Sequence, residues 1–450
     1  MHHLFRLIRL PRETSYCVAL TFRRLCSTQD NVEPKKPKQA QKGTAKSKQH
    51  QPLEGEGDVI NEPKKLKGEG KKKTQAELLA EHVAQEPAAV QKLLQQFDAQ
   101  LNKSKPNPET FYIINESIAD SVVRHLSGHS LDIPHLELGP GPGVLTRRLL
   151  EAGVRRIVGF ETTSAFQHCV RMLSEQTDGA VRLTPLNLMH LSKFYGASAH
   201  GDDSRVLKVV DGLEHRDWTD EPCMRLVGVA HRSVFFQFLV RTVISRELLF
   251  QFGRPELLVY VPEAEYARLT AGPTMAGRVY RPYSIISRML FDLEELDRVP
   301  AKHFYPWVKP RRKVEASGSD MVLIRYAPKA DPGVPEAELH NLDFFVRHCA
   351  VSRTRRIIQQ MEEWVPGCGP RLIALGHGVF APFRELQPQQ VLEVFLEFTK
   401  WPEYPACSFH AAVQQNVLGG EPELADSEHQ LAEDDQHEEP PEHFEPQQYR

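Results

Sequence analysis

The sequence of 450 residues lacks the patterns of a zinc protein, a disulfide-stapled protein or a membrane-spanning protein. Its seven cysteines are scattered without any Cys-x-x-Cys pair, so neither zinc-site spacing nor a disulfide framework is present. We therefore expect no metal site, and a reducing compartment fits this use of cysteine. No apolar run reaches the length of a membrane span, so we expect no membrane partner.

Charge is concentrated at the two ends of the chain. Residues 1–73 carry 17 Lys and Arg against 8 Asp and Glu, whereas residues 421–450 carry 11 acids against one Arg. Such blocks are usually solvated tails, so the near-neutral middle should form the folded part. The first 28 residues hold five Arg and one acid, a composition typical of a mitochondrial transit peptide. This start predicts a protein of the mitochondrial matrix.

The middle of the chain alternates between strand-like and helix-like segments. Short apolar runs predict strands at 135–139, 155–161, 181–187 and 223–230 and from 256, with helices between them. This alternation favours an α/β fold with a doubly wound, Rossmann-like sheet. We expect six parts: a transit peptide (1–28), a disordered basic linker (29–73), an N-terminal helical extension with a break at Pro87 (74–105), an α/β domain (106–295), a smaller, mainly helical C-terminal domain (296–415) and a disordered acidic tail (416–450).

A glycine-rich stretch, ELGPGPG, joins the first expected strand to the helix after it. Glycines let the backbone approach a ligand closely, and the helix N-terminus offers free N–H groups. The spacing G-x-G-x-G differs from the G-x-G-x-x-G of dinucleotide sites. Glu161 ends the second expected strand, where an acid can accept hydrogen bonds from ribose hydroxyls. Together these features predict a pocket for a nucleoside.

The stretch ELGPGPGVLTRRLLEAGVRRIVGFE resembles the S-adenosylmethionine loop of the ribosomal RNA adenine N6-dimethyltransferases. FYIINESIADSVV resembles the opening motif of that family, Phe-Leu-x-Asp followed by a helix. The transit peptide and the helical C-terminal segment resemble the mitochondrial transcription factor B branch. The resemblance implies a Rossmann-like S-adenosylmethionine methyltransferase domain, and it implies S-adenosylmethionine as cofactor, either in use or as a vestige.

The resemblance also assigns cofactor roles to individual residues. Tyr112 matches the opening-motif residue that packs near the cofactor, and Glu161 matches the ribose ligand. Asn187 stands where the family has an Asp that contacts the adenine amino group; it keeps a carbonyl acceptor and loses the charge. The glycines of the loop are Gly139, Gly141 and Gly143.

The catalytic motif of the family does not occur in this chain. The family carries Asn-Leu/Pro-Pro-Tyr after the fourth strand, where the Asn accepts from the target amine and the aromatic ring stacks on the flipped adenine. No similar string occurs between 187 and 260. The positions of the motif are taken by Gly228, Val229, Ala230 and His231. We therefore expect a degenerate catalytic site.

Basic residues suggest that the chain binds nucleic acid. The expected contacts are Lys309, Arg311, Arg312, Lys313, Arg353, Arg355 and Arg356. The first four follow Phe304, Tyr305 and Trp307, and basic residues beside aromatics suit phosphate contact with base stacking. The alternative for each cluster is a solvated basic face with aromatics in the core.

Two functions stay open. The resemblance implies a transcription initiation factor of the mitochondrial nucleoid, whose partners are the mitochondrial RNA polymerase and melted, single-stranded promoter DNA. The alternative is an active dimethyltransferase on adjacent adenines of small-subunit ribosomal RNA.

Overall fold

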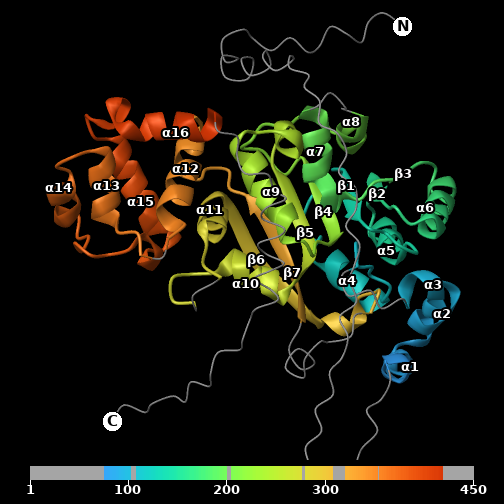
Figure 1. The fold of residues 1–450 in the computed structure, drawn as a ribbon. Helices are drawn as coiled ribbons and strands as arrows, with labels where there is room; N and C mark the ends of the chain where they lie inside the picture. The colour runs from blue at the N-terminus through green and yellow to red at the C-terminus, as the bar shows by residue number, and fades with distance from the viewer. Residues whose placement is uncertain are drawn as a thin grey trace, which may run out of the picture. The chain divides into compact units, whose positions relative to one another are not determined.

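The computed structural model describes residues 75–102, 108–199, 204–275, 279–307, 320–352 and 354–418 (Figure 1). All of them belong to one compact unit, residues 71–450. The expected transit peptide and basic linker lie outside the described residues. The acidic tail does so beyond Leu418, where the last helix, α16 (Ser408–Leu418), ends.

A seven-stranded sheet forms the centre of this unit, with strand order β3-β2-β1-β4-β5-β7-β6. Strands β1 to β5 are parallel, and β7 pairs antiparallel with both β5 and β6. The expected doubly wound α/β fold is therefore confirmed, and its order reverses at β1 and β4, where ligands bind in such sheets. The strands are β1 (His135–Leu138), β2 (Ile157–Phe160), β3 (Val181–Thr184), β4 (Met224–Val229), β5 (Pro255–Pro262), β6 (Phe291–Pro300) and β7 (Asp320–Pro328).

Helices pack on both faces of the sheet, whose edge strand β6 stays partly exposed. Leu226 of β4 belongs to the hydrophobic cluster that contains α9, whereas the next residue, Val227, belongs to the cluster of α4 and α5. Successive side chains of a strand point to opposite faces, so such a strand reads as an uninterrupted apolar run. One face carries α4 (Glu116–Arg124), α5 (Val144–Glu151) and α6 (Ser164–Gln176), and the other carries α7 (Leu191–Ala199), α8 (Ser204–Val210), α9 (Ser233–Ile244), α10 (Glu263–Thr270) and α11 (Pro282–Leu290).

The C-terminal helices share a core with one face of the sheet. Phe345 of α12 and Phe395 of α15 belong to the same buried cluster as α9 and α11, and the Tyr280 hydroxyl donates to the Leu386 carbonyl at 2.7 Å. The helices are α12 (Leu339–Ala350), α13 (Ile357–Trp364), α14 (Gly369–Ala374), α15 (Pro388–Thr399) and α16.

The boundary expected between residues 295 and 296 is wrong. It falls inside β6, and β6 and β7 complete the sheet, so the helical part begins only at α12. The physical reason is that β6 is an edge strand whose residues are mostly half-buried or exposed. Such a strand produces no apolar run in the sequence.

The N-terminal helices support the start of the α/β part. They are α1 (Gln75–Gln85), α2 (Ala88–Gln96) and α3 (Asp98–Leu101), and the expected break at Pro87 is confirmed. Leu94 and Leu101 pack in one buried cluster with Tyr112, Phe166 and Tyr305. The extension therefore lies behind the segment that resembles the family's opening motif.

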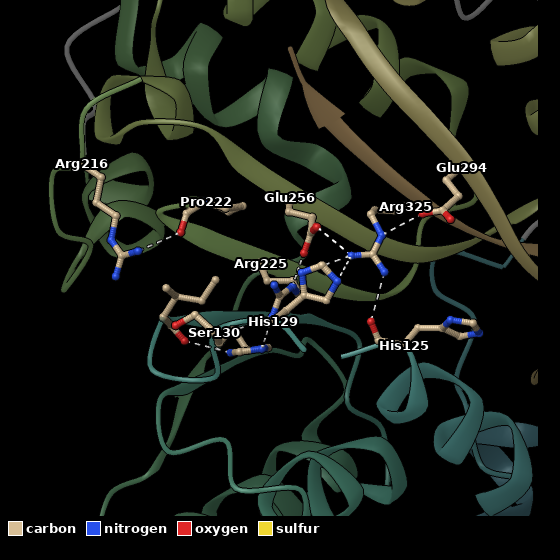
Figure 2. A network of polar contacts seen from close by, with 11 residues as sticks. His125, His129, Ser130, Arg216, Pro222, Arg225, Glu256, Glu294 and Arg325 are labelled. Carbon is tan, nitrogen blue, oxygen red and sulfur yellow. Dashed lines mark hydrogen bonds and ion pairs between the residues drawn. The ribbon is translucent and has the colours of Figure 1, made fainter. Parts of the chain in front are cut away.

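An ion-pair network joins β4, β5 and β7 (Figure 2). Arg225 and Glu256 stand near the amino ends of the parallel strands β4 and β5, whereas the glycine loop follows the carboxyl end of β1. Arg225 is 1% exposed; its Nε donates to Glu256 Oε2, and its Nη1 donates to the Ser130 carbonyl at 3.2 Å. Glu256 Oε1 accepts from Arg325 Nη1 at 3.2 Å. Burial and the Arg225 cation lower the pKa of His135 to about 4, so its ring is neutral at pH 7.

Among the described helices, none combines the length and the apolar composition needed to cross a membrane. In the same part of the chain, no three His, Cys, Asp or Glu side chains gather in a way that could hold a metal ion.

Candidate functional site

The glycine loop connects β1 to α5 at the carboxyl edge of the sheet. Gly139, Gly141 and Gly143 have φ angles of +66°, +58° and +84°, which L side chains rarely adopt. Space is limiting as well, because a Cβ on Gly141 would lie 2.8 Å from Cδ1 of Tyr112, and a Cβ on Gly139 would overlap the methyl group of Thr110. Backbone conformation and close approach both require glycine here.

Glu161 follows β2 and points into the same edge of the sheet. Its carboxylate accepts from Thr163 N at 2.7 Å, from Gly141 N at 3.2 Å and from the Tyr112 hydroxyl at 3.4 Å. Only 2% of Glu161 is exposed, and burial raises its pKa. The structure thus places Glu161, the residue expected to bind ribose, beside the glycine loop and Tyr112. Its carboxylate already accepts hydrogen bonds from three groups of this chain.

Glu137, in β1 just before the loop, is a second buried carboxylate of this region. Thr146 of α5 donates to its Oε2 at 2.7 Å, while Oε1 has no hydrogen-bond partner. Burial raises the pKa of Glu137 to about 7. Glu137 therefore helps to fix the start of α5 against β1.

Asn187 follows β3 and caps a short 3-10 helix, Leu188–His190. Its Oδ1 accepts from Met189 N at 2.9 Å. Its Nδ2 donates to the Glu109 carbonyl at 3.3 Å and to Thr110 Oγ1 at 3.4 Å. The expected adenine contact therefore holds the backbone of the segment that precedes Tyr112.

Residues 108–112, which we name the strap, contact Glu161 and Asn187 and lie against Gly139 and Gly141. Tyr112 N donates to the Tyr305 carbonyl at 2.6 Å, and Tyr305 N donates back to the Tyr112 carbonyl at 3.3 Å. The Tyr112 hydroxyl also lies 3.1 Å from Thr163 Oγ1. Burial raises the pKa of Tyr112. A cavity of about 220 Å³ lies on this segment, lined by Ala99, Gln100, Pro108, Glu109, Thr110, Tyr112, Thr162, Thr163 and Pro306.

The four expected positions of the catalytic motif lie at the end of β4. Gly228 pairs with both β1 and β5, and Val229 pairs with β5, so both lie within the strand, as the expected strand at 223–230 implies. Only Ala230 and His231 come after the strand. Nε2 of His231 lies 3.1 Å from the Pro108 carbonyl oxygen. The rings of His231 and Phe111 form a T-shaped pair. Burial, then Arg232, lowers the pKa of His231 to about 4.

Of the seven expected nucleic-acid contacts, the structure describes two. Lys309, Arg311, Arg312, Lys313 and Arg353 lie outside the described residues. Of the two alternatives for the aromatics before Lys309, the structure supports core residues and not base stacking, because Phe304, Tyr305 and Trp307 are at most 8% exposed. Tyr305 and Trp307 pack under the N-terminal helices, and Phe304 packs on Tyr260.

Arg355 and Arg356 lie together at the start of α13. Arg355 Nη1 donates to the His348 carbonyl and to Gln360 Oε1, each at 2.9 Å. Arg356 is exposed, and its guanidinium lies 4.8 Å from the ring centre of Phe380, which is 72% exposed. A hollow of about 260 Å³ adjoins the two arginines, lined by Ser352, Thr354, Arg355, Arg356, Gln359, Gln360 and Glu363.

Residues 102–399 match the family model described as ribosomal RNA adenine dimethylase. The chain belongs to this family. The mitochondrial dimethyladenosine transferase 2 of Drosophila melanogaster is 27% identical over 392 residues, which cover 74% of this chain and 87% of that protein. The human protein of the same name is 24% identical over 274 residues, covering 57% and 68%. A dimethyladenosine transferase structure from Plasmodium falciparum covers 64% of this chain and 96% of its own, at 15% identity and a TM-score of 0.43. The expected family is therefore confirmed.

S-adenosylmethionine is the methyl donor of the adenine dimethylase family, as the resemblance implied. The residue types of the cleft fit this group, since a carboxylate, an amide and a glycine loop meet at one edge of the sheet. The arrangement leaves little room for it, because Glu161 and Asn187 are 2% and 9% exposed and both contact the strap. For these two residues to hold ribose and adenine, the strap has to move.

Three residues of the adenine dimethylase cleft and of the basic surface could not be named from sequence. Thr110 and Thr163 carry no motif, and they join the cleft through contacts with Asn187 and Tyr112. Phe380 lies in a loop after α14, and nothing in its neighbourhood in the sequence separates an exposed Phe from a buried one.

Proposed function

We propose that this chain is a mitochondrial transcription initiation factor that assists the mitochondrial RNA polymerase by holding melted promoter DNA. It acts in the matrix, at the nucleoid, and transfers methyl groups weakly or not at all. The family and the mitochondrial names of the relatives support the setting. The observation that carries the nucleic-acid role is the exposed pair of Arg356 and Phe380 beside the hollow at Arg355.

This surface has the chemistry of a single-strand site. The exposed ring of Phe380 offers a stacking surface that accepts any base, and Arg356 and Arg355 supply positive charge for phosphates. The backbone holds the two partners together, since Arg356 and Pro382 form an antiparallel bridge and Ile357 N donates to the Ala381 carbonyl at 3.0 Å. A ring and a cation fixed on paired segments lose little freedom when a strand binds.

The second candidate is an active dimethyltransferase on adjacent adenines of mitochondrial small-subunit ribosomal RNA. The glycine loop and Glu161 favour it, because both retain the residue types of a methyl-donor site. The residues from 227 to 233 argue against it. They read Val-Gly-Val-Ala-His-Arg-Ser, so in any register no Asn is available to accept from a target amine.

Replacing Arg356 and Phe380 together with alanine should weaken binding to single-stranded DNA by about tenfold or more, since stacking on an aromatic ring is worth about 1–3 kcal/mol per base. The same variant should lose most of its activity in promoter run-off transcription with the mitochondrial RNA polymerase. Affinity is measured by fluorescence anisotropy at two salt concentrations, because loss of a phosphate contact also flattens the salt dependence.

The matched control is Arg171→Ala with Leu207→Ala, which also removes one exposed cation and one exposed apolar side chain. It should keep wild-type affinity and run-off activity. Polymerase that initiates equally well without this chain would remove the transcription role, whatever the DNA affinity.

Methyl transfer gives an independent prediction. Incubation of the chain with tritiated S-adenosylmethionine and small-subunit ribosomal RNA should leave little label in the RNA. The reason is that Ala230 and His231 follow β4, and no Asn side chain is present there to accept a hydrogen bond from the target amino group. The measurement is scintillation counting of the recovered RNA, beside a family member with an intact motif as positive control. Robust dimethylation of adjacent adenines would establish the second candidate in place of the first.

A further inference from the structure

Three departures from the family's motifs share one neighbour, the strap at residues 108–112. Tyr112 adds a hydroxyl where the first two positions of the opening motif are apolar. Asn187 stands in place of an Asp, and His231 stands in place of an aromatic without a ring nitrogen. Each of the three side chains makes a contact to or from the strap that the family's residue would not make in the same way.

The contact of Asn187 depends on its amide. Nδ2 donates to the Glu109 carbonyl and to Thr110 Oγ1, at 3.3 and 3.4 Å. An ionised Asp has only acceptors, so it would face the Glu109 carbonyl without any hydrogen bond. The change from Asp to Asn therefore converts a repulsive position into an attractive one for the strap.

The contact of Tyr112 depends on its hydroxyl, which lies 3.4 Å from Glu161 Oε1 and 3.1 Å from Thr163 Oγ1. Leu and Phe cannot make either bond. The ring of Tyr112 meanwhile packs on Gly141 and on Phe166. The strap thus covers the carboxylate that the family uses for ribose, and it gives that carboxylate a hydrogen-bond donor.

The contact of His231 holds the other end of the strap. The ring is neutral, and Nε2 faces the Pro108 carbonyl at 3.1 Å, so Nε2 carries the hydrogen and donates. Phe111 packs edge-to-face on the same ring, with 5.1 Å between ring centres. The strap is therefore held at Pro108, at Glu109 and Thr110, and at Tyr112.

A second layer keeps Tyr112 in place from behind. Tyr112 and Tyr305 exchange two backbone hydrogen bonds, and the Tyr305 hydroxyl lies 3.1 Å from Nε2 of His82 in α1. The N-terminal helices thereby connect to the strap through Tyr305.

We propose that the strap closes the cofactor cleft of this chain, and that Tyr112, Asn187 and His231 are the groups that hold it closed. S-adenosylmethionine and the closed strap compete for Glu161 and Asn187. The three departures from the family pattern therefore do two things. They remove catalytic groups, and they supply contacts that hold the strap in place. The closed cleft is independent of the polymerase and can be tested without it.

The test is cofactor binding by the full chain, measured by isothermal titration calorimetry with S-adenosylmethionine. Tyr112→Phe removes one fastening and adds no cofactor contact, so it should bind at least about fivefold tighter than the wild type, the effect of one hydrogen bond. Asn187→Asp with Tyr112→Phe should gain about tenfold or more. An unchanged or weaker affinity of Tyr112→Phe would overturn the proposal, since Asn187→Asp alone could act on the adenine directly.

Hydrogen–deuterium exchange of the peptide that contains the strap gives a readout that needs no cofactor. Exchange should be faster in Tyr112→Phe than in the wild type, and adding S-adenosylmethionine to the wild type should raise it further, because the cofactor displaces the strap. Protection of the strap by the cofactor would contradict the proposal.

Tyr280→Phe is the control, because it removes a hydroxyl that donates to a carbonyl at 2.7 Å far along the chain from the strap. It should leave both strap exchange and cofactor affinity at wild-type values. Run-off transcription separates the two proposals. A strap variant that binds the cofactor and still supports initiation leaves the proposed function intact. Loss of initiation in Arg356→Ala with Phe380→Ala does not bear on the strap proposal.

Discussion

Replacing Glu256 with alanine should lower the free energy of unfolding by about 3–5 kcal/mol, because it leaves a buried cation without its counter-ion. Arg225 is 1% exposed, and its Nε forms an ion pair with the carboxylate of Glu256. The same carboxylate also faces Arg325 of β7, at 3.2 Å (Figure 2). Removing Glu256 therefore breaks the ion pair between β5 and β4 and the ion pair between β5 and β7. Urea-induced unfolding followed by circular dichroism gives the free energy.

An exposed ion pair provides the control. Arg371 donates to both oxygens of Glu403, at 2.9 and 2.7 Å, but the two side chains are 44% and 42% exposed. Glu403→Ala should change the free energy of unfolding by less than about 1 kcal/mol, because solvent screens the pair. A Glu256→Ala variant that loses no more than Glu403→Ala would show that water reaches Arg225.

A paired replacement separates the lost attraction from the stranded charge. Arg225→Met with Glu256→Leu removes both charges and keeps the volume, so it should recover most of the stability that Glu256→Ala loses. If the double variant is as unstable as the single one, the two residues act through the shape of the packing rather than through charge.

The sequence could predict those parts of the site whose signals are local. The glycine loop and Glu161 lie within one strand–helix–strand unit. Because β1 and β2 are parallel neighbours, the loop after β1 and the residue after β2 must meet at the same edge of the sheet. The break at Pro87 is local in the same sense, because proline removes a backbone donor from the helix interior. Strands β1, β2 and β4 are buried along their whole length and β5 along all but its last residue, so these strands gave mostly apolar segments. Strand β3 is half-buried at Arg182 and Leu183 and was predictable from its place in the strand–helix alternation.

The strap could not be predicted, because its contacts join residues far apart in the chain. The Tyr112 hydroxyl and Glu161 are 49 positions apart, and His231 and the Pro108 carbonyl are 123 apart. The motifs showed which residues depart from the family pattern, but not that the departures meet on one segment. A single-residue substitution reads as a loss until the three-dimensional neighbour is known.

For the aromatic residues near basic ones, the sequence left two alternatives open. Phe304, Tyr305 and Trp307 stand next to a basic run, but they are buried, because α1, α2 and the sheet cover them. Phe380 is exposed, and Arg356, its cation, is 24 positions away in the sequence and adjacent only across a backbone bridge. Burial decides whether such a pair can bind a base, and burial is a property of the fold.

Replacing Gly228 with asparagine should not restore methyl transfer, and it should lower the free energy of unfolding by about 2–6 kcal/mol. Residue 228 has a φ angle of +122°, and strained backbone of this kind costs about 1–3 kcal/mol for a residue with a side chain. A Cβ there would lie 2.7 Å from the carbonyl oxygen of Leu138 in β1, so overpacking adds about 1–3 kcal/mol. Tritium transfer and urea unfolding of the same variant measure the two effects.

Gly179→Asn is the matched control for this substitution. Gly179 also has a positive φ angle, +80°, but a Cβ there would meet nothing within 4 Å. Asparagine tolerates the left-handed conformation after a helix, so this variant should stay within about 1 kcal/mol of the wild type. A stable Gly228→Asn variant that methylates adenine would show that the missing side chain alone separates this chain from an active dimethylase. A destabilised, inactive one means that the backbone of β4 itself excludes a side chain at this position, so that a reversion would need β1 and β4 to move together.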